Sequence, residues 1–301
     1  MRNRKNYTYN VLLGLNRASE PIAWIWDHAN ALAVIGKGGS GKTTNASYWL
    51  SQLACQGVRF LMADPHMDNK ESLYANTKHL HEAFIAPCVK EYKDITKAID
   101  TYHALGHERI NNRAEHFPLV FVIDEFTSYL LSSEDTKHAA LKLLDSANQY
   151  RKVGLRLMLI GQSWGDAVKK ASSLRDAISD SVVLRSAYNN ALKFCSFAAT
   201  AKEANVLPVG RGYFMDEMIW IPRLTGTDKL VTFDIVREYQ HGGYTNTPVL
   251  VTPIETPIVS PRKSTVTKRK NIVTTRKSTK KPILPYIDKT KEIFLHAIRD
   301  I

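Results

Sequence analysis

The chain has 301 residues, of which 44% are hydrophobic and 23% are charged, as in an ordinary globular protein. Its three cysteines lie far apart and form no metal-ligand pattern, and no apolar run approaches the length that spans a bilayer. We therefore expect a cytoplasmic protein with room for one large α/β domain and appendages.

The formal net charge of +12 is concentrated in two segments. Residues 1–9 carry three Lys or Arg and residues 261–282 carry nine, with no acid in either segment, so the rest of the chain is neutral overall. Basic segments commonly bind nucleic acid by releasing counterions from its phosphates. The alternative is a solvated linker that only keeps the protein soluble.

The first predicted elements, in chain order, are one or two strands within 7–26 and a short buried strand at 31–35. A glycine-rich run follows at 36–44, and a helix is expected over 44–54. The run fits the phosphate-loop pattern G-x-x-x-x-G-K-[ST], in which glycines let the backbone curl until successive N–H groups face an anion. The candidate nucleotide-binding residues are Gly36, Lys37, Gly38, Gly39, Ser40, Gly41, Lys42, Thr43 and Thr44.

Two side chains of this run have expected roles in an ATP site. Lys42 can reach the β- and γ-phosphates, and the Thr43 hydroxyl can bind Mg²⁺. The following helix directs the free N–H groups of its N-terminus at the phosphates. ATP and Mg²⁺ are therefore the expected cofactors.

A pair of acids follows a central predicted strand. After the first helix, the sequence predicts a strand at 58–63, helices at 70–84 and 94–105, and the central strand at 118–123. Asp124 and Glu125 follow the central strand directly. In an open α/β sheet, ligands lie beyond the carboxyl ends of the strands. We expect Asp124 to hold Mg²⁺ through its water shell and Glu125 to orient and polarise the attacking water.

The remaining predicted elements alternate between helix and strand. They are expected at 136–152, 155–160, 173–179, 181–185 and 188–199, followed by a hairpin over 210–222. This alternation predicts an α/β fold with a doubly wound, mostly parallel sheet and helices on both faces.

Other polar residues lie at or near the strand ends. Gln162 follows the strand at 155–160, where its amide can contact the γ-phosphate or the water and sense the nucleotide. Asp64 ends the strand at 58–63 and either helps to position Mg²⁺ or forms a local Asp-Pro turn. Phosphoryl transfer also uses a cation on the developing charge, often an arginine from another subunit. The candidates are Arg151, Arg175, Arg185 and Arg211.

At these residues the chain resembles the FtsK/HerA branch of the RecA-like motor ATPases. The similarity covers about residues 22–222. It is carried by Trp24–Asp27 before the phosphate loop, by Val122–Phe126, by Tyr150–Leu155 with the strand that ends at Gln162, and by 174–185.

The resemblance implies an ATP-hydrolysing translocase that works as a hexameric ring with double-stranded DNA in its pore, in plasmid or viral DNA transfer, segregation or packaging. Arg151 then corresponds to an arginine finger that acts on the neighbouring subunit, and Gln162 to the sensor. The candidate pore-facing loops are 127–137 and 163–173.

The phosphate loop departs from this family at Lys37-Gly38-Gly39, which resembles the deviant loop of ParA-type partition ATPases. The alternative function is therefore a nucleotide-switched dimer that acts on DNA. Glu125 and the segment from Arg151 to Gln162 favour the motor family.

We expect four segments in the chain. They are an N-terminal lead-in at 1–21, an ATPase motor domain at 22–247, a flexible Pro/Lys/Arg-rich linker at 248–285 and a C-terminal helical stub at 286–301. The basic tail can contact DNA or an acidic protein partner.

Overall fold

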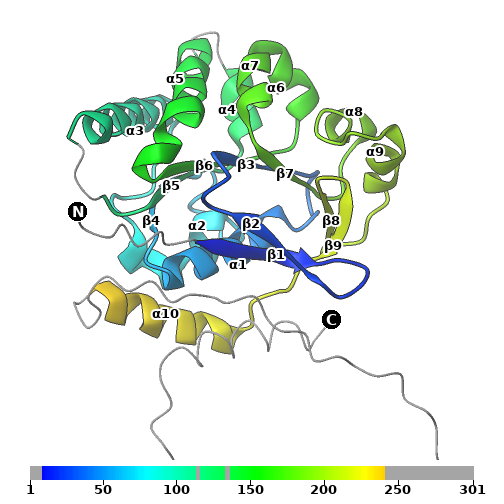
Figure 1. The fold of residues 1–301 in the computed structure, drawn as a ribbon, viewed down its shortest axis with the longest axis horizontal. Helices are drawn as coiled ribbons and strands as arrows, with labels where there is room; N and C mark the ends of the chain where they lie inside the picture. Colours follow the sequence, from blue (N-terminus) through cyan, green and yellow to red (C-terminus); the bar gives the residue numbers. More distant parts are fainter. Residues whose placement is uncertain (1–8, 113–115, 133–135, 241–301) are drawn as a thin grey trace, which may run out of the picture.

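A computed structural model describes residues 9–112, 116–132 and 136–240. The predicted linker and C-terminal stub lie outside the described residues. Within these ranges one mixed sheet of nine strands, in the order β2-β1-β9-β8-β7-β3-β6-β5-β4, forms the centre of the fold (Figure 1). The strands are β1 Asn10–Leu15, β2 Pro21–Ile25, β3 Ala31–Ile35, β4 Arg59–Ala63, β5 Leu119–Ile123, β6 Leu155–Gly161, β7 Asp180–Val183, β8 Arg211–Phe214 and β9 Glu217–Trp220.

Strands β4, β5, β6, β3 and β7 pair in parallel, and we call them the parallel half. Every residue of β3, β5 and β6 is buried, as near-continuous apolar runs require when helices cover both faces of a sheet. Because these strands point the same way, the residues that follow them meet at one edge.

Strands β8, β9, β1 and β2 pair antiparallel, and we call them the antiparallel half. The sequence predicts a mostly parallel sheet, and the sheet is mixed: among the described strands parallel pairing ends at β7, and the antiparallel half includes the hairpin expected over 210–222. The lead-in residues of β1 belong to the same sheet, since β1 pairs with both β2 and β9.

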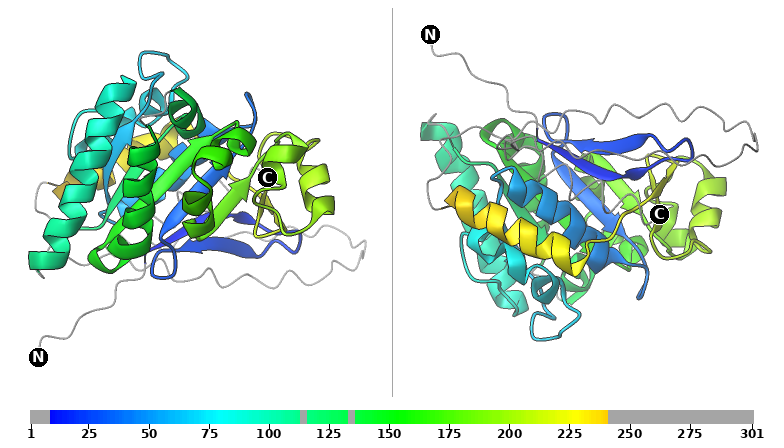
Figure 2. Two further views of the ribbon diagram at one scale, coloured as in Figure 1. Left: turned by 90° about the horizontal axis from the view of Figure 1, so that it is seen from above. Right: turned by 90° about the horizontal axis from the view of Figure 1, so that it is seen from below.

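Helices pack on both faces of the sheet and bury two hydrophobic clusters (Figures 1 and 2). One face carries α1 Lys42–Cys55 and α10 Gly226–Gln240, which lie side by side, with the short α2 Leu73–Asn76 and η1 Lys78–Ala83. The other face carries α3 Tyr92–Asn112, α4 Phe126–Ser132, α5 Thr136–Gln149, η2 Tyr150–Val153, α6 Trp164–Lys170, α7 Ser172–Ala177, α8 Tyr188–Ala191 and α9 Ala198–Ala204.

Several helices differ from their predicted bounds. The helix expected over 70–84 is two short turns, because Ser72 caps α2 and Thr77 ends it. The helix expected over 188–199 is likewise divided into α8 and α9. Helix α10 was not predicted, although Ile235 and Val236 are buried in the core beside α1.

Both segments predicted as pore-facing loops are largely helical where they are described. Residues 126–132 form α4, with Phe126, Tyr129 and Leu130 buried against the sheet. Residues 164–170 form α6, and α7 begins at Ser172. Among the described helices, none is long and apolar enough to cross a membrane.

Candidate nucleotide-binding site

The glycine-rich loop connects β3 to α1 at the carboxyl edge of the parallel half. Gly39 and Gly41 have φ angles of +68° and +94°, a conformation that side-chain-bearing residues rarely adopt. A Cβ on Gly36 would come within 2.3 Å of the Ser40 Oγ. The loop therefore depends on glycine at these three positions for its tight curl.

Backbone hydrogen bonds hold the loop between the two neighbouring strands. The Gly36 N–H donates to the Gly161 carbonyl at the end of β6, at 3.3 Å, and the Lys37 N–H donates to the Arg185 carbonyl after β7, at 2.9 Å. The Arg185 guanidinium donates to the Gly39 carbonyl at 3.0 Å. The segments after β6 and β7 thus fix the loop from both sides.

Lys42 begins α1 and turns back over the loop, where its Nζ lies 3.4 Å from the Lys37 carbonyl oxygen. Its side chain is buried, which lowers its pKa, while Glu125 and Asp124 partly offset this lowering. The ammonium therefore lies close enough to both carboxylates to interact with them, as an ATP site with these residues requires.

Three carboxylates gather where β4 and β5 end. Asp64 is fully buried and accepts the backbone N–H groups of His66 and Tyr74 at 2.8 and 2.9 Å. Asp124 is 6% exposed, and burial, with contributions from Asp64 and Glu125, raises its pKa to about 7. This concentration of buried negative charge calls for a cation.

The residues present fit a magnesium ion. Hard oxygen ligands are what Mg²⁺ prefers, and the ion usually keeps several waters while contacting one or two protein groups. Asp124 supplies a carboxylate whose pKa is raised chiefly by burial and further by Asp64 and Glu125. Thr43, the residue after Lys42, is half-buried at the start of α1 and supplies the candidate hydroxyl.

Glu125 is held in an uncommon backbone conformation, with φ of +49°. Its two carboxylate oxygens accept hydrogen bonds from the Gln162 amide at 2.9 Å and from the Ser128 hydroxyl at 3.1 Å. The Gln162 side chain also borders the loop, since its Oε1 is 3.9 Å from the position that a Gly38 Cβ would take. Gln162 thus joins the candidate base to the phosphate loop.

A buried threonine that sequence reasoning missed fixes this arrangement. The Thr127 hydroxyl accepts the N–H groups of Gln162 and Ser163 at 3.0 and 3.2 Å. Its side chain lies so close to Gly161 that a Cβ there would be 2.4 Å from the Thr127 Cγ2. The apolar spacing of Phe126, Tyr129 and Leu130 was the available signal that this segment is a helix.

Arg151 lies away from the other candidate residues. It is in η2, before β6 begins, and its guanidinium donates to the carbonyl of His28, before β3 begins, at 3.1 Å. This is the amino edge of the parallel half, whereas Lys42, Glu125 and Gln162 are at the carboxyl edge. Arg151 therefore has no place in the nucleotide site of its own chain.

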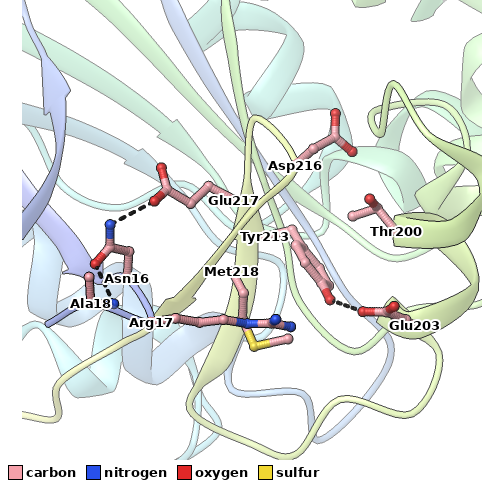
Figure 3. Close-up of a pocket in the computed structure, with 9 residues that line it drawn as sticks. All are labelled: Asn16, Arg17, Ala18, Thr200, Glu203, Tyr213, Asp216, Glu217 and Met218. Carbon is pink, nitrogen blue, oxygen red and sulfur yellow. Dashed lines mark hydrogen bonds between the residues drawn. The ribbon is translucent and has the colours of Figure 1, made fainter. Parts of the chain in front are cut away.

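A pocket in the antiparallel half contains none of the predicted site residues (Figure 3). It lies between the β1–β2 turn, α9 and the β8–β9 hairpin. Two pairs of its polar side chains are hydrogen-bonded: Asn16 donates to Glu217 at 2.7 Å, and Tyr213 donates to Glu203. The pocket is a separate feature from the nucleotide site.

The chain is similar in fold to several solved structures. Neither protein-family models nor curated proteins give a match. Among solved structures, the pCW3 conjugation coupling protein TcpA, in its monomer form with ATPgS, has a TM-score of 0.61 at 17% identity, over 77% of this chain and 71% of that chain. VirB4 of Thermoanaerobacter pseudethanolicus has a TM-score of 0.53 at 14% identity, over 75% of this chain and 99% of that chain.

EccC of Thermomonospora curvata (ATPases 2 and 3), in complex with a signal sequence peptide, has a TM-score of 0.58 at 14% identity. The match covers 73% of this chain and 42% of that chain, so the chain spans less than half of the EccC structure. At these identities the similarity establishes the fold. The resemblance predicted from the sequence is confirmed at that level: the chain has the fold of the FtsK/HerA-type P-loop ATPases.

Proposed function

We propose that the chain is the ATP-hydrolysing subunit of a RecA-like, ring-shaped motor that moves double-stranded DNA. The observation that carries this proposal is the position of β6 between β3 and β5. Its end places Gln162 in contact with Glu125 and beside the phosphate loop. A residue there can respond to the γ-phosphate and to the attacking water at once.

In this site Lys42 and the N–H groups of the loop neutralise and orient the phosphates. Mg²⁺, held by Thr43 and Asp124, supplies further positive charge to the phosphate oxygens when it is bound. Glu125 accepts a proton from the attacking water, and Gln162 and Ser128 fix the direction of its carboxylate. Burial of Asp124 and Lys42 strengthens each of these interactions.

The position of Arg151 supports action between subunits. Because it lies at the opposite edge of the sheet from Lys42, it can reach a transferring phosphate only in a neighbouring chain. We therefore assign Arg151 as the arginine finger of a closed ring of six subunits. A lone subunit would then hydrolyse ATP slowly.

The basic segments at 1–9 and 261–282 fit a polyanionic partner such as double-stranded DNA. DNA transfer, segregation or packaging is the process we assign to the motor. The basic C-terminal tail is also available to an acidic protein partner.

The test is ATP hydrolysis by the full chain with and without duplex DNA, together with its mass in the presence of ATP. We expect hydrolysis to rise with DNA and the particle to be larger than a dimer. An ATP-dependent dimer would favour the ParA-like partition switch instead, and absence of DNA stimulation would contradict the motor.

A mixing experiment tests Arg151 separately. Arg151→Ala chains and Lys42→Ala chains should each be inactive, whereas a mixture should regain hydrolysis, because some sites combine an intact Lys42 with an intact Arg151 of the neighbour. Arg17→Ala, an exposed arginine of the β1–β2 turn, is the matched control and should keep full activity. No recovery on mixing would remove Arg151 from this role.

A further inference from the structure

Two histidines and an aspartate gather at the surface between α3 and α5, and the nucleotide site does not use them. His103 and His107 are four residues apart on α3, so they lie on the same face of that helix. Their ring centroids are 4.5 Å apart. Asp145 projects toward them from α5.

The possible ligand atoms of this cluster converge. The Asp145 Oδ2 lies 2.9 Å from the His103 Nε2 and 3.9 Å from the His107 Nε2. One ligand atom from each of the three residues fits within a span of 4.8 Å. Among the described residues, no other group of three or more His, Cys, Asp or Glu side chains meets this condition.

These separations suit a tetrahedral metal ion. Zn²⁺ bonds of about 2.0–2.2 Å to nitrogen and oxygen place two ligand atoms of a tetrahedron roughly 3.4 Å apart. The two Asp145 distances, 2.9 and 3.9 Å, lie on either side of that value. Small shifts of the surface side chains would therefore bring the atoms to bonding positions.

The surroundings hold the cluster in place. The buried Tyr150 ring packs against both imidazoles, with centroid distances of 5.7 Å to His103 and 5.6 Å to His107. Gly106 leaves room for this ring, because a Cβ there would be 2.2 Å from it. The Gln149 amide donates to the other Asp145 oxygen, which leaves Oδ2 for the ion.

The Tyr150 hydroxyl provides an independent sign of a missing partner. It is buried and accepts or donates no hydrogen bond within the part of the chain that the structure describes. A water molecule bound to a metal ion in the cluster offers this hydroxyl a partner.

We propose that His103, His107 and Asp145 form a zinc-type transition-metal site, with water as the fourth ligand. Two imidazole nitrogens and one carboxylate oxygen favour Zn²⁺ over Mg²⁺ or Ca²⁺. On binding, the ion takes the place of the hydrogen on the His103 Nε2, and that hydrogen moves to Nδ1 as the ring changes tautomer, so the imidazole stays neutral. The ion joins α3 to α5.

The proposed metal site is separate from the proposed ATP site and does not depend on it. His103 and His107 follow Tyr102, whose hydroxyl donates to the Arg156 carbonyl near the start of β6. The cluster is therefore near the amino edge of the parallel half. Helix α5 leads through Tyr150 directly into Arg151, so an ion here would fix the segment that carries the candidate finger.

The experiment titrates the chelator-treated full chain with Zn²⁺ by calorimetry, and with Co²⁺ while visible absorption is recorded. We expect one ion per chain, a tetrahedral Co²⁺ spectrum and a higher melting temperature with Zn²⁺. His107→Ala and Asp145→Asn should each weaken binding at least tenfold and remove the thermal shift.

Two controls keep the test decisive. His138→Ala changes an exposed histidine of α5 outside the cluster and should bind zinc like the wild type. Lys42→Ala should also bind zinc normally, which separates this proposal from the ATPase proposal. If the wild type binds no ion in a saturable way, or if circular dichroism shows folded His107→Ala and Asp145→Asn chains that bind as tightly as the wild type, the site does not exist.

Discussion

The parallel and antiparallel halves of the sheet share a core but differ in what their strand ends carry. In the parallel half, β3, β4, β5 and β6 all end at one edge, which gathers the loop, the three carboxylates and Gln162. In the antiparallel half, neighbouring strands end at opposite edges, and near the β8–β9 hairpin Asn16 pairs with Glu217 and Tyr213 with Glu203.

The comparison shows how strand direction creates a site. Parallel strands bring chemically unsatisfied groups together because their ends share an edge, and the structure tolerates the cost: a carboxyl whose pKa is raised to about 7 and a glutamate with positive φ. Antiparallel strands close a sheet with local turns, and the positive φ angles of this half, at Ser19, Met215 and Asp216, belong to those turns. Variants placed in matched positions of the two halves can therefore test whether function resides in only one of them.

The largest difference is expected between two glutamates. Glu125→Gln should reduce ATP hydrolysis by about 10²–10⁴-fold, because a positioned general base contributes that much, while ATP binding remains. Glu217→Gln in the antiparallel half should leave hydrolysis unchanged. Steady-state phosphate release and nucleotide binding by fluorescence measure the two effects, and equal losses in both variants would contradict the division.

A smaller but still large effect is expected for Lys42→Ala. Removing this cation should reduce hydrolysis by about 10²–10³-fold, comparable to the loss of one preorganised donor, and should weaken ATP binding as well. Lys202→Ala, an exposed lysine of α9 beside the antiparallel half, is the control. Normal ATP binding by Lys42→Ala would show that the loop does not hold the phosphates.

Two glycines, one in each half, allow a comparison at the same shortest contact distance. A Cβ on Gly161 would meet the Thr127 Cγ2 at 2.4 Å, and a Cβ on Gly14 would meet the Trp220 carbonyl oxygen at 2.4 Å. Each change to Ala should lower the free energy of unfolding by about 1–3 kcal/mol. Only Gly161→Ala should also lower hydrolysis, because it displaces the segment that positions Gln162. Denaturant unfolding and ATPase assays on the same variants measure the two effects. A loss of activity in Gly14→Ala as large as in Gly161→Ala would contradict the prediction.

The smallest effect concerns the pH dependence of stability. The folded-state pKa of Asp124 is about 7 against a usual 3.8, so the unfolded chain releases this proton at lower pH. The group's contribution to stability therefore falls as pH rises from about 4 to 7 and stays low above that. Asp124→Asn removes the charge, so without nucleotide it should melt a few degrees higher than the wild type at pH 8, with less difference at pH 5.

Magnesium provides the control for this prediction. Mg²⁺ with an ATP analogue should raise the melting temperature of the wild type, because the cation compensates the buried carboxylate, and should have little effect on Asp124→Asn. Scanning calorimetry at pH 5 and pH 8 makes the measurement. If the melting temperatures of the wild type and of Asp124→Asn changed equally between pH 5 and pH 8, the ionised Asp124 carboxylate would carry no cost in its buried position, which would contradict the prediction.

The sequence predicted the parallel half well for a physical reason. Buried parallel strands such as β3 and β5 are continuous apolar runs, and the residues that follow them stand out by polarity. Their order along the chain was therefore enough to assign the loop, Asp124, Glu125 and Gln162 to one edge of the sheet. Their contacts, such as the Gln162–Glu125 hydrogen bond, depend on the β3-β6-β5 order, which no local pattern specifies.

Other features could not be predicted because they depend on tertiary packing. The hairpin over 210–222 was expected, but its antiparallel pairing with β7 and with β1 is decided by long-range contacts. The Thr127 hydroxyl has a role only because β6 ends beside α4. The convergence of His103, His107 and Asp145 requires α3 and α5 to pack together.

The most direct test of the central claim is a crystal structure of the Glu125→Gln chain with Mg²⁺ and ATP. We expect the triphosphate in the 36–43 loop, the ion between Thr43 and Asp124, and the γ-phosphate within reach of residues 125 and 162. A nucleotide bound elsewhere, or an empty loop at saturating Mg²⁺ and ATP, would contradict this expectation.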